Sequence, residues 1–151
     1  MYSKHEAALL KKEFWTALGS YLKPIPNANG YPINWVNYKT GIRHIYFRTD
    51  VTKKEASAAI ELTHPVQEDR LVAFEKMQCL KTVFRETVSG EWYWQEAVYD
   101  EQGIPLSRII CFKENVNIFN KTDWPEIIAF LKERLTGLDA FWVIAKDHFE
   151  P

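Results

Sequence analysis

Residues 33–64 constrain the fold of this chain more than any other stretch, because they predict consecutive strands separated by short turns. Val, Ile, Tyr, Phe and Thr are frequent here, and apolar and polar positions alternate. Gly41 can take the positive φ that a two-residue hairpin turn requires, and residues 51–54 form a second short connection. The predicted strands span residues 33–39, 42–50 and 55–64. This three-strand meander is the centre of the expected sheet.

The apolar positions also predict how these strands pair, because a shift of one residue would turn every side chain to the other face. Matching them pairs Ile45 with Ile60 and places Val36 beside Ile45 on the core side. The opposite face then carries Asn37, His44 and Glu61 in one row across the three strands. The next rows are Trp35, Tyr46 and Ala59, and then Arg48 and Ser57.

The remaining elements are predicted from caps, apolar stripes and turn residues. Ser3 and Glu6 form a capping box for a first helix, and Asp123 with Glu126 forms another for a last helix, which Gly137 is expected to bend or split. A middle helix follows Pro65 and ends before residue 90, and a hairpin covers residues 92–99 and 105–113. The expected fold class is therefore α+β, with a mainly antiparallel five-stranded sheet and about three packing helices. The chain is long enough to form a single globular domain over residues 1–151.

Composition excludes several classes of protein. Apolar residues make up 46% of the chain, which rules out a disordered protein. The 19 Lys and Arg balance 20 Asp and Glu, so the basic excess typical of strong nucleic-acid or membrane-surface binders is absent. The first ten residues do not resemble a secretory signal, and no apolar run is long enough to span a membrane. Cys79 and Cys111 lack metal or redox spacing. We expect a cytoplasmic protein with no membrane association.

Several long segments resemble a family of small bacterial domains of unknown function. They are residues 35–48, 59–65 and 116–120, the last leading into Asp123-Trp124-Pro125, and the resemblance extends from Phe14-Trp15 to Phe141-Trp142. Members of that family occur alone, or as the C-terminal part of longer proteins whose N-terminal part looks like a restriction-type nuclease. The resemblance implies a link to such systems, and it supplies no catalytic residues to transfer to this chain.

That link prompts the hypothesis of a metal-dependent nuclease, whose site needs two or three carboxylates around one ion. Asp50 and Glu61 on adjacent strands imitate the pattern. The predicted pairing places Asp50 opposite Glu55, which puts Glu61 roughly 20 Å along the sheet. We reject this pair as a metal site and predict no metal ligands and no cofactor, since nucleotide-binding, hydrolase and zinc-protease motifs are also absent.

The candidate site is the polar face of the meander. His44 beside Glu61 is the candidate catalytic pair, because a carboxylate orients a neighbouring imidazole for proton transfer. The candidate ligand-binding residues are Trp35, Asn37, Tyr46 and Arg48. Arg48 with Lys39 and Arg43 can instead recognise an anion or a phosphate backbone. Ordinary cross-strand pairs on a solvated face remain the commoner explanation of such residues.

Two functions follow. The first is a binding or interaction module, accessory to nucleic-acid-processing or defence systems, whose partner is a nucleic acid or a protein. The alternative is a small enzyme that uses the row of Asn37, His44 and Glu61, with a degenerate nuclease behind it. An enzyme needs these residues in a concave pocket, whereas a module needs only an exposed surface.

Overall fold

The computed structural model describes residues 2–151 and has an α+β fold with four strands and four α-helices. The strands are β1 (Ile45–Val51), β2 (Glu55–Leu62), β3 (Trp92–Tyr99) and β4 (Pro105–Glu114). The helices are α1 (Lys4–Leu22), α2 (Gln67–Cys79), α3 (Lys81–Thr87) and α4 (Trp124–Ala145), with short 3-10 turns at Lys121–Asp123 and Lys146–His148.

The sheet has the order β1-β2-β4-β3, and every neighbouring pair is antiparallel. It consists of two hairpins joined through β2 and β4, so β1 and β3 are the edge strands. The prediction of a five-stranded sheet is wrong, because residues 33–39 form no strand. The predicted α+β class and the antiparallel pairing are confirmed.

Side-chain contacts explain why residues 33–39 do not extend into a strand. Asn34 Oδ1 accepts a hydrogen bond from the Asn37 backbone N–H at 3.1 Å, which closes a local turn around Trp35. The Trp35 ring is buried, with 3% of its surface exposed, and its Nε1 donates to the Ile25 carbonyl at 2.8 Å. These contacts hold the segment against the core and away from the backbone of β1.

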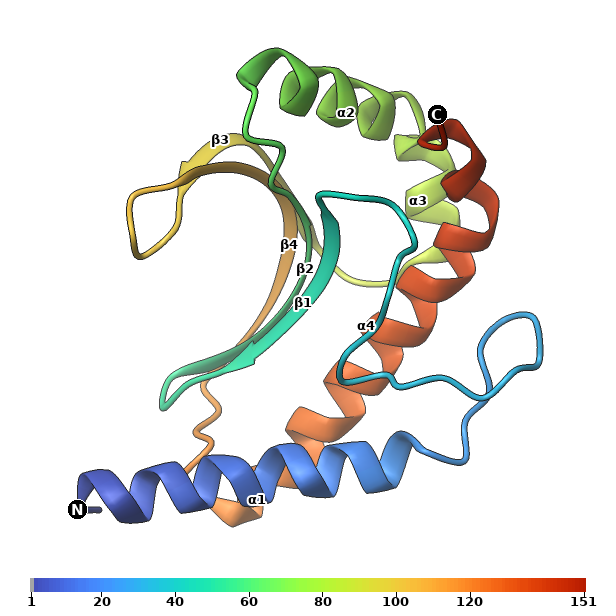
Figure 1. Cartoon of the computed structure of the whole chain (residues 1–151). Helices are drawn as coiled ribbons and strands as arrows, with labels where there is room; N and C mark the ends of the chain where they lie inside the picture. The colour runs from blue at the N-terminus through green and yellow to red at the C-terminus, as the bar shows by residue number, and fades with distance from the viewer. Residues whose placement is uncertain (1) are drawn as a thin grey trace.

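One face of the sheet packs against the helices. The row Phe47, Ile60, Ile109 and Trp94 runs across all four strands on this side. Figure 1 shows α2, α3 and α4 along this convex face, while the sheet curls so that its other face is concave. None of the helices in residues 2–151 covers the concave face. The molecule therefore presents a curved, polar sheet surface on the side away from the helices.

The helices differ from the sequence prediction in number and in their caps. The capping box of Ser3 and Glu6 is confirmed, with reciprocal hydrogen bonds of 3.1 and 3.3 Å. The predicted helix between residues 65 and 90 is two helices, because the backbone turns at Leu80 (φ −98°, ψ 10°). The prediction of about three helices is therefore corrected to four.

Helix α4 is continuous, so a split at Gly137, one of the two predicted outcomes, is wrong. A Cβ at Gly137 would lie 3.2 Å from Val88 Cγ1, which indicates that this glycine allows close packing against the end of α3. The second capping box is also wrong. Asp123 makes no side-chain cap to α4, and its Oδ2 instead accepts from the Asn117 backbone N–H at 3.0 Å.

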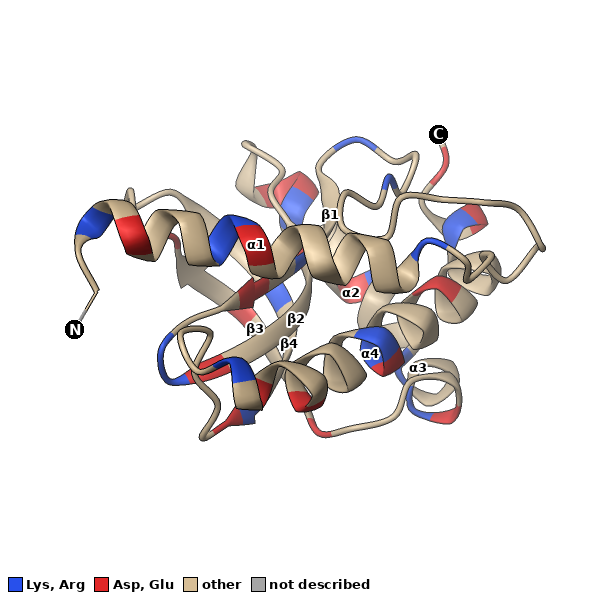
Figure 2. Ribbon diagram, turned by 90° about the horizontal axis from the view of Figure 1, so that it is seen from below, with Lys and Arg blue, Asp and Glu red and all other residues tan. Residues whose placement is uncertain are grey.

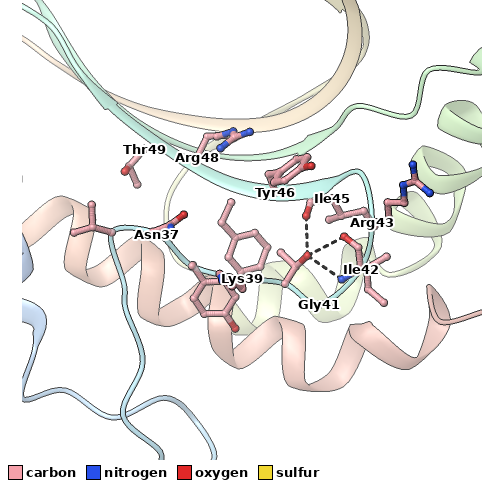
Figure 3. A pocket seen from close by; sticks show the side chains of 13 residues that line it. Asn37, Lys39, Gly41, Ile42, Arg43, Ile45, Tyr46, Arg48 and Thr49 are labelled. Atoms are coloured by element: carbon pink, nitrogen blue, oxygen red, sulfur yellow. Dashed lines mark hydrogen bonds between the residues drawn. The ribbon is translucent and has the colours of Figure 1, made fainter.

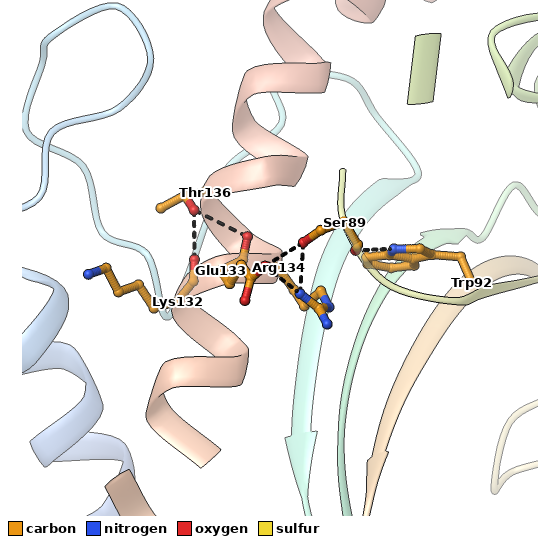
Figure 4. Close-up of polar contacts among 6 residues, drawn as sticks. All are labelled: Ser89, Trp92, Lys132, Glu133, Arg134 and Thr136. Carbon is orange, nitrogen blue, oxygen red and sulfur yellow. Dashed lines mark hydrogen bonds and ion pairs between the residues drawn. The ribbon is translucent and has the colours of Figure 1, made fainter. Parts of the chain in front are cut away.

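The connection between α3 and β3 is fastened to α4 by a small polar network, drawn in Figure 4. Ser89 Oγ donates to Glu133 at 2.7 Å, and Arg134 donates to the same hydroxyl at 2.9 Å. The hydrogen bond from Ser89, and then the positive charge of Arg134, lower the pKa of Glu133. The Trp92 indole donates to the Ser89 carbonyl at 2.9 Å, which fixes the start of β3.

Charges of both signs are mixed over the helical layer. Figure 2 shows Lys and Arg alternating with Asp and Glu along α1 and α4. This distribution agrees with the formal net charge of −1 and gives these helices no strongly basic face.

Candidate functional site

A groove runs along the free edge of β1, between this strand and residues 36–43 (Figure 3). Its volume is about 540 Å³, within the range of sites that hold small ligands or short peptide segments. We call it the β1 groove. It is lined by Val36, Asn37, Tyr38, Lys39, Thr40, Gly41, Ile42, Arg43, Ile45, Tyr46, Phe47, Arg48 and Thr49.

Aromatic rings form the apolar part of the groove. Tyr38 and Phe47 stack with their centroids 4.7 Å apart and their planes 21° apart, and Phe47 packs edge-on against Trp142 of α4. The Tyr38 hydroxyl donates to the buried carboxylate of Asp139 at 2.5 Å. Burial, and then the hydrogen bond to Asp139, raise the pKa of Tyr38 far above its ordinary value. The phenol therefore stays a donor, and the ring is held in one position.

A compact turn closes one end of the groove. Thr40 Oγ1 donates to the Ile45 carbonyl at 2.7 Å and accepts from the Ile42 backbone N–H at 3.2 Å (Figure 3). Gly41 has a φ of +79°, and a Cβ there would lie 2.8 Å from Lys146 Nζ. The positive φ favours glycine, whereas the lysine tip could move aside for a Cβ. The predicted positive φ of Gly41 is thus confirmed, whereas the predicted two-residue hairpin turn is wrong, because no strand precedes it.

The groove is basic. Lys39, Arg43 and Arg48 contribute three positive side chains, and no Asp or Glu lies among the lining residues. The Arg48 guanidinium lies 4.4 Å from the centre of the Tyr46 ring and 3.5 Å from the Glu61 carboxylate, and its side chain is 55% exposed. Within residues 2–151, Lys39 and Arg43 make no ion pair.

Three of the four candidate ligand-binding residues lie together in this groove, namely Asn37, Tyr46 and Arg48. The fourth, Trp35, was expected on the exposed face of a strand, and the structure instead buries it in the core with α1 and α4. The pattern failed there because an alternating sequence does not reveal that its segment lacks a strand partner.

The predicted row of Asn37, His44 and Glu61 is not formed. The true register pairs Tyr46 with Glu61 and Phe47 with Ile60, a shift of two residues from the prediction. Because the shift is even, the predicted faces of β1 and β2 are retained while the neighbours change. His44 lies before β1 with a φ of +69°, and its carbonyl accepts from the Thr63 backbone N–H at 2.8 Å.

His44 lies beside His64, with the ring centroids 5.3 Å apart. Burial, and then the charge of His44, lower the pKa of His64, and Nδ1 of His64 is buried without a hydrogen-bond partner. Glu61 instead forms its ion pair with Arg48. Within residues 2–151, no ion pair or side-chain hydrogen bond joins His44 to Glu61, so the candidate catalytic pair is not formed.

Sequence reasoning missed part of the polar sheet face. Tyr46, Glu61, Arg108 and Gln95 form one row across the four strands, and Arg108 Nε donates to Gln95 at 2.5 Å. Arg108 and Gln95 were placed in strands by the sequence, but nothing in it indicated that β4 pairs with β2. The charge of Arg108 directly before the apolar run 109–112 was the available signal.

The structure offers no arrangement for a metal ion in the part of the chain it describes, where no group of three His, Cys, Asp or Glu side chains converges. Asp50 pairs with Ser57, so Glu61 lies four residues further along β2, or about 13 Å away. The corrected register thus still separates the two carboxylates of the nuclease hypothesis.

Comparison with known proteins gives one match. Residues 10–146 match the family described as Domain of unknown function (DUF4268). The chain belongs to this family. No curated protein and no solved structure matches it significantly. No helix in residues 2–151 is long and apolar enough to cross a membrane.

Proposed function

We propose that this DUF4268 domain is a binding module whose ligand is an anionic chain held in the β1 groove. The observation that supports it is the presence of Lys39, Arg43 and Arg48 among the residues that line one groove, with no carboxylate among them. Lys39 and Arg43 have no ion-pair partner in the described residues, so an anionic ligand would neutralise charges that the protein itself does not neutralise.

We favour this function over a small enzyme because proton transfer needs an oriented imidazole. His44 faces His64, and Glu61 is engaged by Arg48. The link to nucleic-acid-processing or defence systems and the location in the cytoplasm remain predictions that rest on the sequence.

The test compares two variants with equal loss of charge. In the first, Lys39, Arg43 and Arg48 are all replaced by Ala. In the matched control, the replaced residues are Lys12, Lys23 and Lys53, which are exposed and lie outside the groove. Binding of fluorescently labelled poly-glutamate and of a single-stranded oligonucleotide is measured by anisotropy at several salt concentrations.

We expect the unchanged protein to bind at least one probe, with an affinity that falls as salt rises. The groove variant should bind about tenfold more weakly or worse, which corresponds to about 1.4 kcal/mol, while the control stays within about twofold. If neither probe binds, or if both variants lose affinity equally, the proposal is wrong.

A further inference from the structure

The free edge of β1 has backbone groups that point into the β1 groove. The hydrogen bonds that flank the β1–β2 ladder run from Thr63 N–H to the His44 carbonyl and from Thr52 N–H to the Glu55 carbonyl. In an antiparallel pair the direction alternates with each residue, so the even-numbered residues of β1 bond to β2. The N–H and C=O groups of the odd-numbered residues therefore point outward.

Part of this edge is already satisfied by the protein and part is open. The Ile45 carbonyl accepts from Thr40, and the Ile45 N–H donates to the Ile42 carbonyl at 3.3 Å. In residues 2–151, the backbone groups of Phe47 and Thr49 have no protein hydrogen-bond partner. The groove thus offers two donors and two acceptors spaced as in a strand.

Residues 36–43 run beside this edge, and within residues 2–151 their one backbone hydrogen bond to β1 is that from Ile45 to Ile42, before the open positions Phe47 and Thr49 (Figure 3). Tyr38 is tied to Asp139 of α4, and Thr40 is tied to the start of β1. These contacts fix the segment on the far side of the groove, so an incoming strand does not have to displace it. An edge strand with free backbone groups, beside a segment that is held in place, is suited to β-strand addition.

We infer that the β1 groove takes an extended acidic peptide segment of another protein, which adds to the sheet as a strand beside β1. This inference rests on the proposed function and specifies the ligand. Residues opposite Phe47 and Thr49 would direct their side chains toward the Tyr38–Phe47 rings and are expected to be apolar. Residues opposite Tyr46 and Arg48 would lie on the basic side and are expected to be Asp or Glu. The motif is an alternation of apolar and acidic residues.

Charge and geometry favour this ligand over two others. A nucleic acid has no backbone N–H groups to pair with the carbonyls of Phe47 and Thr49, and Arg48 already covers the Tyr46 ring on which a base would stack. A second copy of this chain, paired through β1 about a two-fold axis, would bring two sets of Lys39, Arg43 and Arg48 together. Like charges would oppose that dimer.

The decisive experiment uses a fluorescein-labelled short peptide in which Val and Glu alternate, with a Val–Lys peptide as the control of charge. Single N-methyl groups are then placed along the Val–Glu peptide, since each removes one backbone donor. Only alternate amides of the peptide would face β1, so N-methylation should weaken binding at every second residue. We expect a loss of affinity of about tenfold or more at those residues and of less than about twofold at the residues between them.

A protein variant tests the same contact from the other side. Thr49→Pro removes an N–H that faces the groove and not β2, a position where an edge strand tolerates proline. Thr49→Val keeps the N–H and is the matched control. We expect the proline variant to lose the peptide about tenfold or more and the valine variant to keep it, with circular dichroism confirming that both are folded. If the proline variant unfolds, the N-methyl series alone decides.

The outcomes distinguish failure of this inference alone from failure of the proposed function. Loss of affinity without a period of two, or equal binding of the Val–Lys peptide, refutes strand addition. A third outcome is that the protein binds the oligonucleotide but not the Val–Glu peptide, and that the variant lacking Lys39, Arg43 and Arg48 loses affinity for the oligonucleotide. This outcome refutes the inference but is consistent with the proposed function. A dimer that the Thr49→Pro variant abolishes identifies a second copy as the occupant. Failure of every anionic probe refutes both.

Discussion

The buried carboxylate of Asp139 offers the sharpest test of how residues 27–38 are held against α4. Asp139 has 3% of its surface exposed and accepts two hydrogen bonds, from the Ala28 backbone N–H at 2.6 Å and from the Tyr38 hydroxyl at 2.5 Å. Replacing it with Ala removes both acceptors. A hydrogen bond to a charged group contributes about 1.5–3 kcal/mol.

The two donors differ in what happens after the substitution. Ala28 is exposed, so water can replace the lost acceptor, whereas Tyr38 is only partly accessible. Relief of the desolvation of the carboxylate offsets part of the loss. We therefore expect Asp139→Ala to lower the free energy of unfolding by about 3 kcal/mol, and Tyr38→Phe, which keeps the ring stack on Phe47, to lower it by about 1.5 kcal/mol.

The assay is urea denaturation followed by tryptophan fluorescence, with Asp147→Ala as the matched control. Asp147 is exposed, and its loss should change stability by less than about 0.5 kcal/mol. If Asp139→Ala costs no more than Asp147→Ala, the carboxylate does not hold the segment and the argument for a fixed groove wall is wrong. If Tyr38→Phe costs as much as Asp139→Ala, the Ala28 contact contributes nothing.

Two further predictions concern pH and backbone conformation. The pKa of His64 is lowered from its ordinary value of 6.5, so the folded state prefers the neutral ring. The neutral His64 ring therefore stabilises the folded state fully above pH 6.5, and this stabilisation is lost as the pH falls below that value. The melting temperature of the protein should fall over the same range. The fall should be smaller in the His64→Gln variant than in a control variant substituted at the exposed His148. Gly90 has a φ of +102°, and a Cβ there would lie 2.7 Å from Arg134 Nε, whereas Gly103 has a φ of +79° and open space around it. Gly90→Ala should cost about 2–3 kcal/mol and Gly103→Ala about 1 kcal/mol in thermal or urea unfolding, and equal costs would contradict the packing argument.

Local sequence predicted the features that depend on neighbours in the chain. The capping box at Ser3, the strand hairpin on either side of residues 100–104 and the positive φ at Gly41 all depend on groups a few residues apart. The alternation of apolar residues assigned the faces of β1 and β2 correctly, because side chains in a strand alternate whatever the partner is. Lys39, Arg43 and Arg48 were likewise grouped by the sequence alone.

Tertiary structure decided what the sequence left open. Residues 33–39 have a strand-like pattern, yet Trp35 is drawn into the core and Tyr38 is tied to Asp139, which lies 101 residues further along the chain. No local signal carries that contact. Because Tyr38 and Trp35 are held away from the backbone of β1, residues 33–39 form no strand and β1 is an edge strand. A groove therefore lies where the sequence predicted a continuous sheet face. The pairing register places Tyr46 rather than His44 opposite Glu61, and the same long-range packing set it. Several registers satisfy one apolar pattern, and only the contacts of the complete fold select among them.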